Sequence, residues 1–303
     1  MKIEFKRLEA EDIEKLTGFY GLRHDPTCDS VILDNFLWRE YYDVRYAVRD
    51  GRAVLWTMTI HGKKYAALPV GRMEDMPGYF KELEQYFNEE LDLPLEIYLA
   101  DEPAVEYLNL PPDRYSVTEL PDSRDYIYNA ESLKTLAGKD LHKKKNHLNS
   151  FVKKFAGRFE YRTLCCSDSH EVWEFLVKWR AQKGQEVEGH LDYEVSGIHE
   201  ILKNCSMLNV RMGGIYVDDS LEAFSIGSYN PLEKMAIIHI EKANPEYRGL
   251  YQCINQQFLI HEFPEAVLVN REDDMGLPGL RQAKMSYAPC GFAKKYRIRQ
   301  ISR

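Results

Sequence analysis

The stretch NREDDMGLPGLRQAKMSYAPCGF covers residues 270–292 and joins a short apolar strand to an amphipathic helix. Four charged residues in a row, Arg271 to Asp274, come before Gly276 and Pro278. Such a run is costly to bury unless each charge finds a partner. Loops at the carboxyl edge of an open sheet are also where ligands bind in α/β folds. The stretch therefore predicts either a helix cap held by salt bridges or part of a binding site.

The composition is that of a folded protein with an acidic surplus. Of 303 residues, 44% are hydrophobic and 12% are aromatic, and the formal net charge is −8. The six cysteines form no C-x-x-C pair and have no histidine at zinc-ligand spacing, which predicts reduced, mostly buried thiols and no metal site. No apolar run approaches the roughly 18–20 residues of a membrane span, and the N-terminal segment is charged throughout, so we expect a cytoplasmic protein.

The element order repeats along the chain. By periodicity, each half reads strand, helix, helix, three strands, helix, strand, with hairpin turns such as Asp50-Gly51. Counting Lys and Arg against Asp and Glu, residues 1–138 carry −11, residues 139–158 carry +6 and residues 159–303 carry −3. We therefore predict two domains of the same fold, residues 1–138 and 159–303, joined by a basic helix that attracts an anionic ligand.

The basic segment predicts a helix with one apolar stripe. The stripe consists of Leu141, Leu148, Val152 and Phe155. Lys144 and Lys145 lie about 40–60° from its centre at 100° per residue. Lysines in that place can extend along apolar surface to reach water, or they can line a cleft and hold the phosphates of RNA, a coenzyme or a lipid headgroup.

Three segments of the second half resemble the GNAT N-acyltransferase fold, whose mixed sheet splays open after its fourth strand. IIHIEKANPEYRG (237–249) resembles that strand and the loop after it, LVNRE (268–272) resembles the fifth strand, and MSYAPCGF (285–292) resembles the Tyr-then-Gly-Phe signature of the last helix. The resemblance implies an α/β (α+β) chain of two tandem GNAT domains, each a mixed central sheet flanked by helices.

The whole chain is similar to a narrower family, the tandem-GNAT C-terminal domains of phosphatidylglycerol lysyltransferases, which are related to Fem-type aminoacyltransferases. The likeness is carried by DLHKKKNHLNSF (140–151), NPEYRGLYQCINQQF (244–258) and NREDDMGLPGLRQAKMSY (270–287). It implies transfer of an activated acyl or aminoacyl group, with aminoacyl-tRNA as a candidate donor, to an amine or hydroxyl acceptor. A binding protein that keeps the fold without catalysis is a further hypothesis, because fold alone does not decide function.

The loop that holds coenzyme A in acetyl-CoA-dependent GNATs differs here. Those proteins place Gly, and then Gly or Ala, three and five residues after an Arg or Gln, so that backbone N–H groups at a helix start hold the pyrophosphate. Counted from Arg248, these positions are Tyr251 and Cys253, and Gly249 does not replace them. We therefore expect acetyl-CoA to bind weakly at the donor loop of Arg248 and Gly249. The alternative is an acetyltransferase with a non-standard loop.

Acyl transfer needs a base, a stabilised oxyanion and an acid. Period-two alternation places Glu241 and His239 on one face of the fourth strand, where either can take the acceptor's proton. By resemblance, Tyr287 is the general acid. A surface carboxylate, a packed histidine and a core tyrosine are the structural alternatives.

The polar junction quoted first is expected to hold the substrates. Its acidic residues suit a cationic amine, and its basic residues suit phosphate or carboxylate. The expected substrate-binding residues are Lys144, Lys145, Asn270, Arg271, Asp273, Asp274, Arg281 and Lys284.

Overall fold

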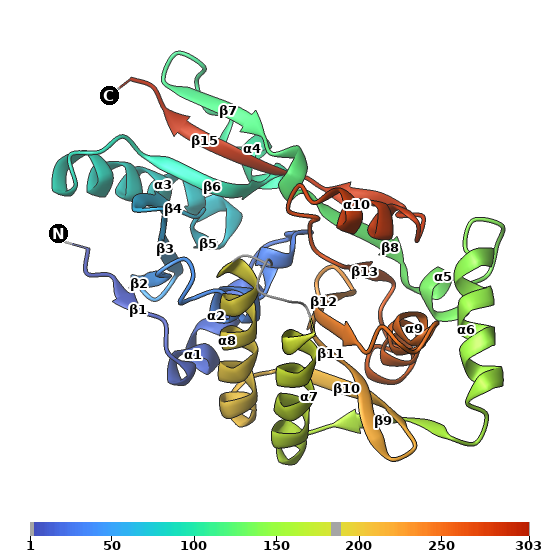
Figure 1. The fold of residues 1–303 in the computed structure, drawn as a ribbon. Helices are drawn as coiled ribbons and strands as arrows, with labels where there is room; N and C mark the ends of the chain where they lie inside the picture. Colours follow the sequence, from blue (N-terminus) through green and yellow to red (C-terminus); the bar gives the residue numbers. More distant parts are fainter. Residues whose placement is uncertain (1–2, 183–188, 303) are drawn as a thin grey trace. The chain divides into compact units, whose positions relative to one another are not determined.

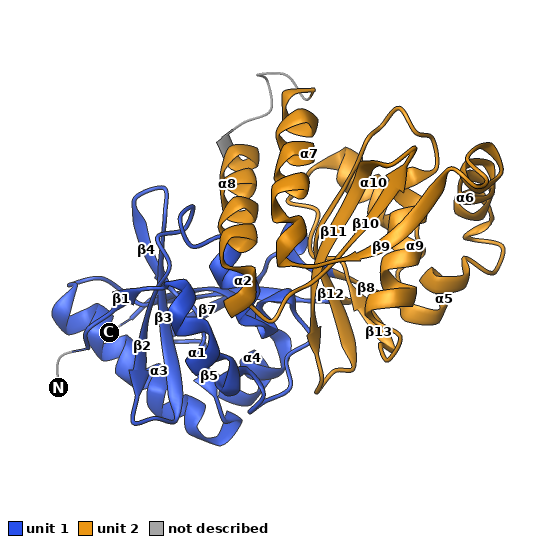
Figure 2. Cartoon of the chain, turned by 90° about the horizontal axis from the view of Figure 1, so that it is seen from below, with its two compact units in different colours: residues 1–125, 293–303 blue, residues 126–292 orange. Residues whose placement is uncertain are grey.

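The computed structural model describes residues 3–182 and 189–302 (Figure 1). The chain divides into two compact units, drawn in blue and orange in Figure 2. Unit 1 is Met1–Asp125 with Ala293–Arg303, and unit 2 is Tyr126–Phe292. No helix in the described ranges is long and apolar enough to cross a bilayer.

Unit 1 is built on a mixed sheet with helices α1 to α4. Its strands are β1 (Lys6–Arg7), β2 (Arg45–Arg49), β3 (Ala53–Ile60), β4 (Lys63–Ala66), β5 (Val70–Gly71), β6 (Glu96–Asp101), β7 (Tyr115–Glu119) and β15 (Lys295–Gln300). Its helices are α1 (Ile13–Tyr20), α2 (Ile32–Leu37), α3 (Met76–Gln85) and α4 (Glu102–Leu108).

Unit 2 is built on a second mixed sheet with helices α5 to α10. Its strands are β8 (Asp125–Asn129), β9 (Phe159–Leu164), β10 (Arg211–Val217), β11 (Ser220–Asn230), β12 (Met235–Ala243), β13 (Leu268–Asn270) and β14 (Gly291–Ala293). Its helices are α5 (Ala130–Thr135), α6 (His142–Lys154), α7 (Ser169–Ala181), α8 (Gly189–Asn204), α9 (Leu250–Glu262) and α10 (Pro278–Met285).

The two sheets follow the same plan. Their strand orders are β1-β2-β3-β4-β6-β15-β7 in unit 1 and β9-β10-β11-β12-β13-β8-β14 in unit 2. In each, four strands run antiparallel, and the fourth then pairs in parallel with the fifth, β4 with β6 and β12 with β13. The repeated element order predicted from the sequence is therefore present.

Each sheet contains a strand from the other half of the sequence. β8 follows β7 in the chain but pairs with β13 in unit 2, whereas β15 follows β14 but lies between β6 and β7 in unit 1. The compact units therefore differ from the predicted domains: residues 126–158 belong to unit 2, and residues 293–303 belong to unit 1. The alternation of a strand shows which face is apolar, but it does not show which sheet the strand joins.

The sheet of unit 2 opens between β12 and β13. The two strands pair only through three residues, from Met235↔Leu268 to Ile237↔Asn270, where β13 ends. β12 continues to Ala243. Within the described ranges, its edge from residue 238 onward therefore has no strand partner on the β13 side. This is the splay predicted after the fourth strand.

Helix α6 belongs to unit 2 and packs on α9. Its buried stripe is Leu141, Leu148, Phe151 and Phe155. The prediction that Val152 belongs to this stripe is wrong, because Val152 is 40% exposed. The stripe continues instead through Phe151, three residues after Leu148. Lys144 lies four residues before Leu148, hence on this buried face, and it is half-buried, whereas Lys145 is exposed.

Two cysteines depart from the expected reduced state. Cys166 and Cys205 form a disulfide that joins the segment before α7 to the segment after α8, with Cα atoms 5.8 Å apart. The antiparallel α7–α8 pair brings these ends together, a proximity that a separation of 39 residues does not reveal. Among the free cysteines, Cys28 and Cys253 are buried, whereas Cys165 and Cys290 are exposed.

Candidate active site

A group of polar side chains converges beside the splay in unit 2, and we call it the splay cluster. It consists of Glu241 from β12, Gln252 and Asn255 from α9, Arg271 after β13, and Tyr287 after α10. Arg271 Nη2 donates to Glu241 Oε1 at 2.9 Å, and Asn255 Nδ2 donates to Glu241 Oε2 at 2.9 Å. Gln252 Nε2 donates to the Tyr287 hydroxyl at 3.2 Å. Elements far apart in the sequence thus supply one network.

Two cations lie against the Tyr287 ring. The Arg271 guanidinium carbon is 4.7 Å from the ring centroid, and Lys144 Nζ, which reaches over from α6, is 4.2 Å from it. Tyr287 is 5% exposed. These contacts bring together three of the predicted residues, Tyr287, Arg271 and Lys144, with the predicted Glu241.

Burial controls the protonation of the splay cluster. It raises the pKa of Tyr287, although the neighbouring Arg271 opposes the shift. It lowers the pKa of Lys144, and the positive charge of Arg271 acts in the same direction. Burial also lowers the pKa of Arg271, but the Glu241 carboxylate together with Tyr287 and Tyr128 outweighs it, so that the net shift is upward. At neutral pH the phenol therefore carries its proton and the guanidinium its charge.

The cluster leaves one donor and one acceptor unused. Arg271 Nη1 and Asn255 Oδ1 are both buried and have no hydrogen-bond partner among the described residues. Each is attached to the same carbon as a nitrogen that donates to Glu241. Buried polar groups in native proteins are nearly always paired, and an exception requires an explanation.

His239 belongs to a different network. Its Nε2 lies 2.8 Å from Ser228 Oγ, and its Nδ1 lies 2.8 Å from Glu272 Oε1. The His239 side chain is fully buried, while that of Glu272 is 20% exposed. The two ring nitrogens thus join a serine on β11 to a carboxylate just beyond β13.

The prediction that Glu241 and His239 share one face is wrong because β12 contains a β-bulge. The pairing with β11 skips His239, which lies between Ile238 and Ile240 where the register shifts. Ile238 and Ala243 pack in the same core cluster although they are five residues apart, which strict alternation does not allow. Glu241 therefore faces α9 with Ala243, whereas His239 contacts the other network.

Part of the polar junction serves its own loop. The buried Asp274 accepts hydrogen bonds from the Tyr126 hydroxyl at 2.5 Å, from two Arg281 nitrogens at 2.8 Å each and from the Gly276 N–H at 2.9 Å. The hydrogen bond from Arg281 holds the pKa of Asp274 well below its usual range. This is the salt-bridge cluster foreseen as one alternative, but Asp274 does not cap α10, whose N-cap residue Leu277 has no side-chain cap hydrogen bond.

The rest of the junction is also internally bonded. Lys284 Nζ donates to the Arg271 carbonyl oxygen at 2.5 Å and to the Asp273 carbonyl oxygen. Asn270 is fully buried, and its Oδ1 accepts the Glu272 N–H at 2.7 Å. The substrate-binding roles of Asn270, Asp273, Asp274, Arg281 and Lys284 stay predictions, while Arg271 is the junction residue that enters the splay cluster.

The start of α9 is closely packed against α6. Gly249, the cap residue, has φ +93°, and a Cβ added to it would lie 2.2 Å from the His147 carbonyl oxygen. Arg248 is exposed and its Nε donates to His147 Nδ1 at 3.1 Å. Tyr251 packs half-buried against the core. Gly249 is thus explained by the close approach of two helices, and the donor-loop role of Arg248 and Gly249 stays a prediction.

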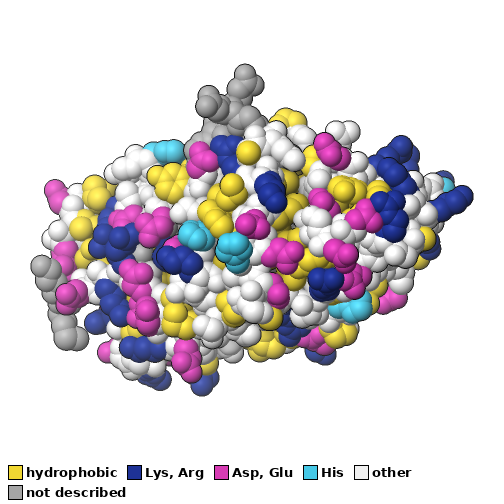
Figure 3. Space-filling model, turned by 60° about the horizontal axis from the view of Figure 1, so that its bottom comes forward, with side chains coloured by type: hydrophobic (Ala, Val, Ile, Leu, Met, Phe, Trp, Pro, Cys, Tyr) yellow, Lys and Arg dark blue, Asp and Glu magenta, His cyan; other side chains and the backbone are white. Residues whose placement is uncertain are grey.

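The outward face of α6 is basic. Lys143, Lys145, Lys153 and Lys154 are exposed. Figure 2 draws α6 at the right-hand end of unit 2. Dark-blue side chains gather at the same end of the face shown in Figure 3. An anionic partner at this helix stays a prediction.

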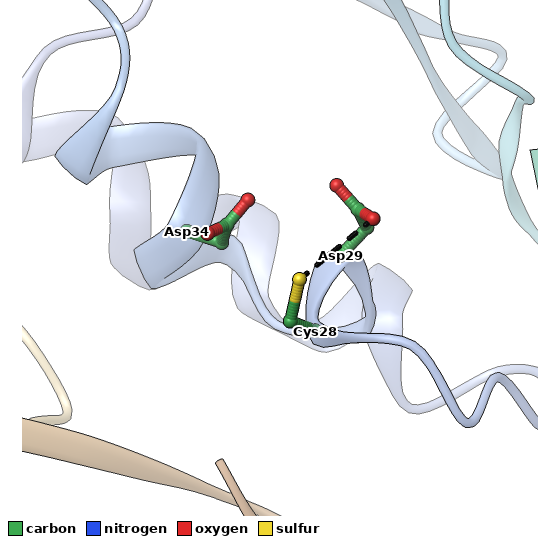
Figure 4. Close-up of side chains that lie close together, drawn as sticks. All are labelled: Cys28, Asp29 and Asp34. Atoms are coloured by element: carbon green, nitrogen blue, oxygen red, sulfur yellow. Dashed lines mark hydrogen bonds between the residues drawn. The ribbon is translucent and has the colours of Figure 1, made fainter. Parts of the chain in front are cut away.

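Unit 1 contains a buried charged cluster that sequence reasoning missed. Cys28, Asp29 and Asp34 offer possible metal-ligand atoms within 4.8 Å of one another (Figure 4). The Lys295 ammonium, however, lies 2.8 Å from Asp29, 3.0 Å from Asp125 and 3.1 Å from the Cys28 sulfur. Because this ammonium already supplies the positive charge, these residues do not fit a metal ion.

Comparisons with known proteins agree with the fold. A protein of unknown function from Bacteroides thetaiotaomicron has a solved structure with a TM-score of 0.89 and 26% identity, covering 98% of this chain and 99% of that one. The structure of L-PGS from Bacillus licheniformis has a TM-score of 0.71 and 14% identity, covering 98% and 95%. An uncharacterized protein of Mycoplasmoides gallisepticum is 28% identical over 229 residues, which are 75% of this chain and 72% of that protein.

The family comparison covers most of the chain. Residues 29–299 match the family model described as phosphatidylglycerol lysyltransferase, C-terminal. The predicted tandem GNAT fold and the predicted family are thereby confirmed, and the chain belongs to the family of phosphatidylglycerol lysyltransferase C-terminal domains.

Proposed function

We propose that this chain transfers an aminoacyl group from an activated ester, with aminoacyl-tRNA as donor, to an amine or hydroxyl acceptor. Membership of a family named for a lysyltransferase supports the reaction class. The observation that carries the proposal is the splay cluster, because it brings a protonated phenol and a guanidinium beside the unpaired edge of β12.

We assign the stabilisation of the oxyanion to the residues at this edge. Attack of the acceptor on the ester carbonyl forms a new bond to carbon and moves negative charge to the carbonyl oxygen. Hydrogen-bond donors fixed before the reaction stabilise such a charge. The unused N–H of Arg271 Nη1 supplies such a donor, with Lys144 adding positive charge nearby.

The acid is assigned to Tyr287. Collapse of the intermediate breaks the bond to the ribose oxygen, which leaves as a hydroxyl only after it gains a proton. The buried phenol of Tyr287 holds that proton at neutral pH, and the cations against its ring stabilise the phenolate that forms. An ester donor depends on this acid more than a thioester does, because a thiol has a pKa of about 8.5 and leaves readily.

The base is assigned to the second network. Glu272 is its partly exposed member, and His239 joins it to Ser228. A carboxylate backed by an imidazole can accept the proton that the acceptor releases. Glu241 holds Arg271 and Asn255 in place.

An acetyl-CoA-dependent reaction is the alternative. The close packing of α6 against Gly249 and the ring of Tyr251 disfavour it, because the pyrophosphate of coenzyme A needs small residues at this helix start. Calorimetry with coenzyme A is expected to give no saturable binding below millimolar concentration, and low-micromolar binding would favour the alternative.

A transfer assay tests the proposal. The protein is incubated with tRNA charged with each radiolabelled amino acid in turn, together with phosphatidylglycerol vesicles or a peptide that carries a free lysine. We expect enzyme-dependent loss of the aminoacyl ester from one charged tRNA and a product whose mass contains that amino acid. Acetyl transfer from acetyl-CoA to the same acceptors, with no transfer from any charged tRNA, would reject the proposal.

A further inference from the structure

The two unused atoms of the splay cluster form a matched pair. Arg271 Nη1 can only donate a hydrogen bond, and Asn255 Oδ1 can only accept one. Both flank Glu241, whose carboxylate oxygens lie 2.9 Å from the neighbouring nitrogens of the same two side chains. Asn255 is 2% exposed, so bulk water does not compensate for the missing bond. A ligand that satisfies both atoms carries both an acceptor and a donor.

The chemistry of acyl groups narrows the ligand. An acetyl or fatty-acyl group has a carbonyl oxygen for Arg271, but it has no N–H for Asn255. An α-aminoacyl group has both, with the carbonyl oxygen and the amino nitrogen separated by two carbons. A negative charge beside the amino nitrogen also favours an amine or ammonium over a neutral blocked amide.

We propose that Asn255 and Glu241 form a subsite for the free α-amino group of the donor, while Arg271 binds its carbonyl oxygen. The inference rests on the proposed function, since it describes the donor of that reaction. The subsite makes the enzyme reject donors whose α-nitrogen is acylated, because a blocked nitrogen leaves the carboxylate and the amide oxygen poorly paired. The expected discrimination is roughly tenfold to a hundredfold in affinity, the usual effect of leaving buried polar groups unpaired.

Binding of stable analogues tests the subsite without turnover. The probes are 3′-alanylamido-3′-deoxyadenosine, an amide that mimics the 3′ end of aminoacyl-tRNA, and its N-acetyl derivative, both measured by calorimetry. We expect the free amine to bind the wild-type protein at least tenfold more tightly. In Asn255→Leu, which removes the acceptor oxygen but leaves the Glu241 carboxylate, the preference for the free amine is expected to fall at least several-fold.

Two variants control for folding. Asn255→Gln keeps an amide that can both donate to Glu241 and accept from the ligand, and it is expected to keep the discrimination, so the test stands even if the leucine variant unfolds. Asn149→Leu removes an exposed asparagine on α6 and is expected to behave as wild type.

The outcomes separate the two proposals. Equal affinities for both analogues in the wild type, no binding of either, or discrimination that is undiminished in Asn255→Leu, each overturn the subsite. Transfer from charged tRNA is measured separately. Its presence would retain the proposed function when the subsite fails, and its absence, with discrimination intact, would reject the function while supporting the subsite.

Discussion

Each unit buries a charged cluster, and the two clusters differ in how completely they are paired. In unit 1, the Lys295 ammonium is bound by Asp29, Asp125 and the Cys28 sulfur, and Asp125 also accepts the Cys28 N–H at 2.6 Å. In unit 2, Arg271 and Lys144 lie near a single carboxylate, and a donor and an acceptor are unused among the described residues. A closed set of charges stabilises a fold, whereas at an open set of this kind we propose that a ligand binds.

The largest effect on stability is expected from removing Lys295, the cation of the charged cluster in unit 1. Lys295→Met leaves Asp125 buried without its ammonium, and removal of one partner of a buried ion pair costs about 3–5 kcal/mol. The free energy of unfolding, measured in urea, should fall by that amount. Lys294→Met is the matched control, because Lys294 is 43% exposed in its pair with Glu102 and should cost less than about 1 kcal/mol. Similar losses of unfolding free energy in both variants would contradict the distinction between the buried cluster and the exposed pair.

At the splay cluster we expect a large effect on turnover and little effect on the free energy of unfolding. Tyr287→Phe removes the proposed acid and should lower turnover about 10²–10⁴-fold, while KM changes little. Tyr107→Phe is the control, since Tyr107 is 49% exposed in unit 1. A Tyr287→Phe enzyme with wild-type turnover would remove Tyr287 from the mechanism.

A smaller loss of unfolding free energy is expected beside the splay cluster, where α6 packs against α9. Gly249→Ala strains a left-handed backbone and places a methyl group against the His147 carbonyl oxygen, so unfolding free energy should fall by about 1–3 kcal/mol. Gly279→Ala, inside α10 with no atom within 4 Å of the added carbon, should be neutral or stabilising by up to about 1 kcal/mol. Equal melting temperatures for the two variants would refute the close packing.

The smallest effect on stability is expected at the Asp274–Arg281 salt bridge beside the splay cluster. The pKa of Asp274 is lowered in the folded protein, chiefly by Arg281, so its stabilisation is present above the unfolded value of about 3.9 and is lost as pH falls through the lower folded pKa. Arg281→Gln should lower stability by about 1 kcal/mol at pH 7 and reduce the further loss on acidification below pH 4. Arg162→Gln, at an exposed pair, is the control. Parallel acid melting curves for wild type and Arg281→Gln would contradict this assignment.

The sequence predicts the elements well because their signals are local. The turn predicted at Asp50-Gly51 has φ of +52° and +66°, as a type I′ turn requires, and the splay falls after the fourth strand. The β-bulge at His239 has no such signal, since it arises from the pairing of two strands. Asn255 had a weaker one: it is the first of three amides between Ile254 and Phe258, and it lies four residues before Leu259, on the buried face of α9.

The exchanged strands have a consequence for how the chain matures on the ribosome. Until β15 has left the exit tunnel, β6 and β7 have no strand between them, and the ammonium that neutralises Asp125 is missing as well. The N-terminal sheet is therefore made first and completed last, which is a long-range contact of the kind that slows folding. During that interval its open edges need protection from neighbouring nascent chains. For the same reason, neither half of the gene is expected to yield a stable product when it is expressed alone.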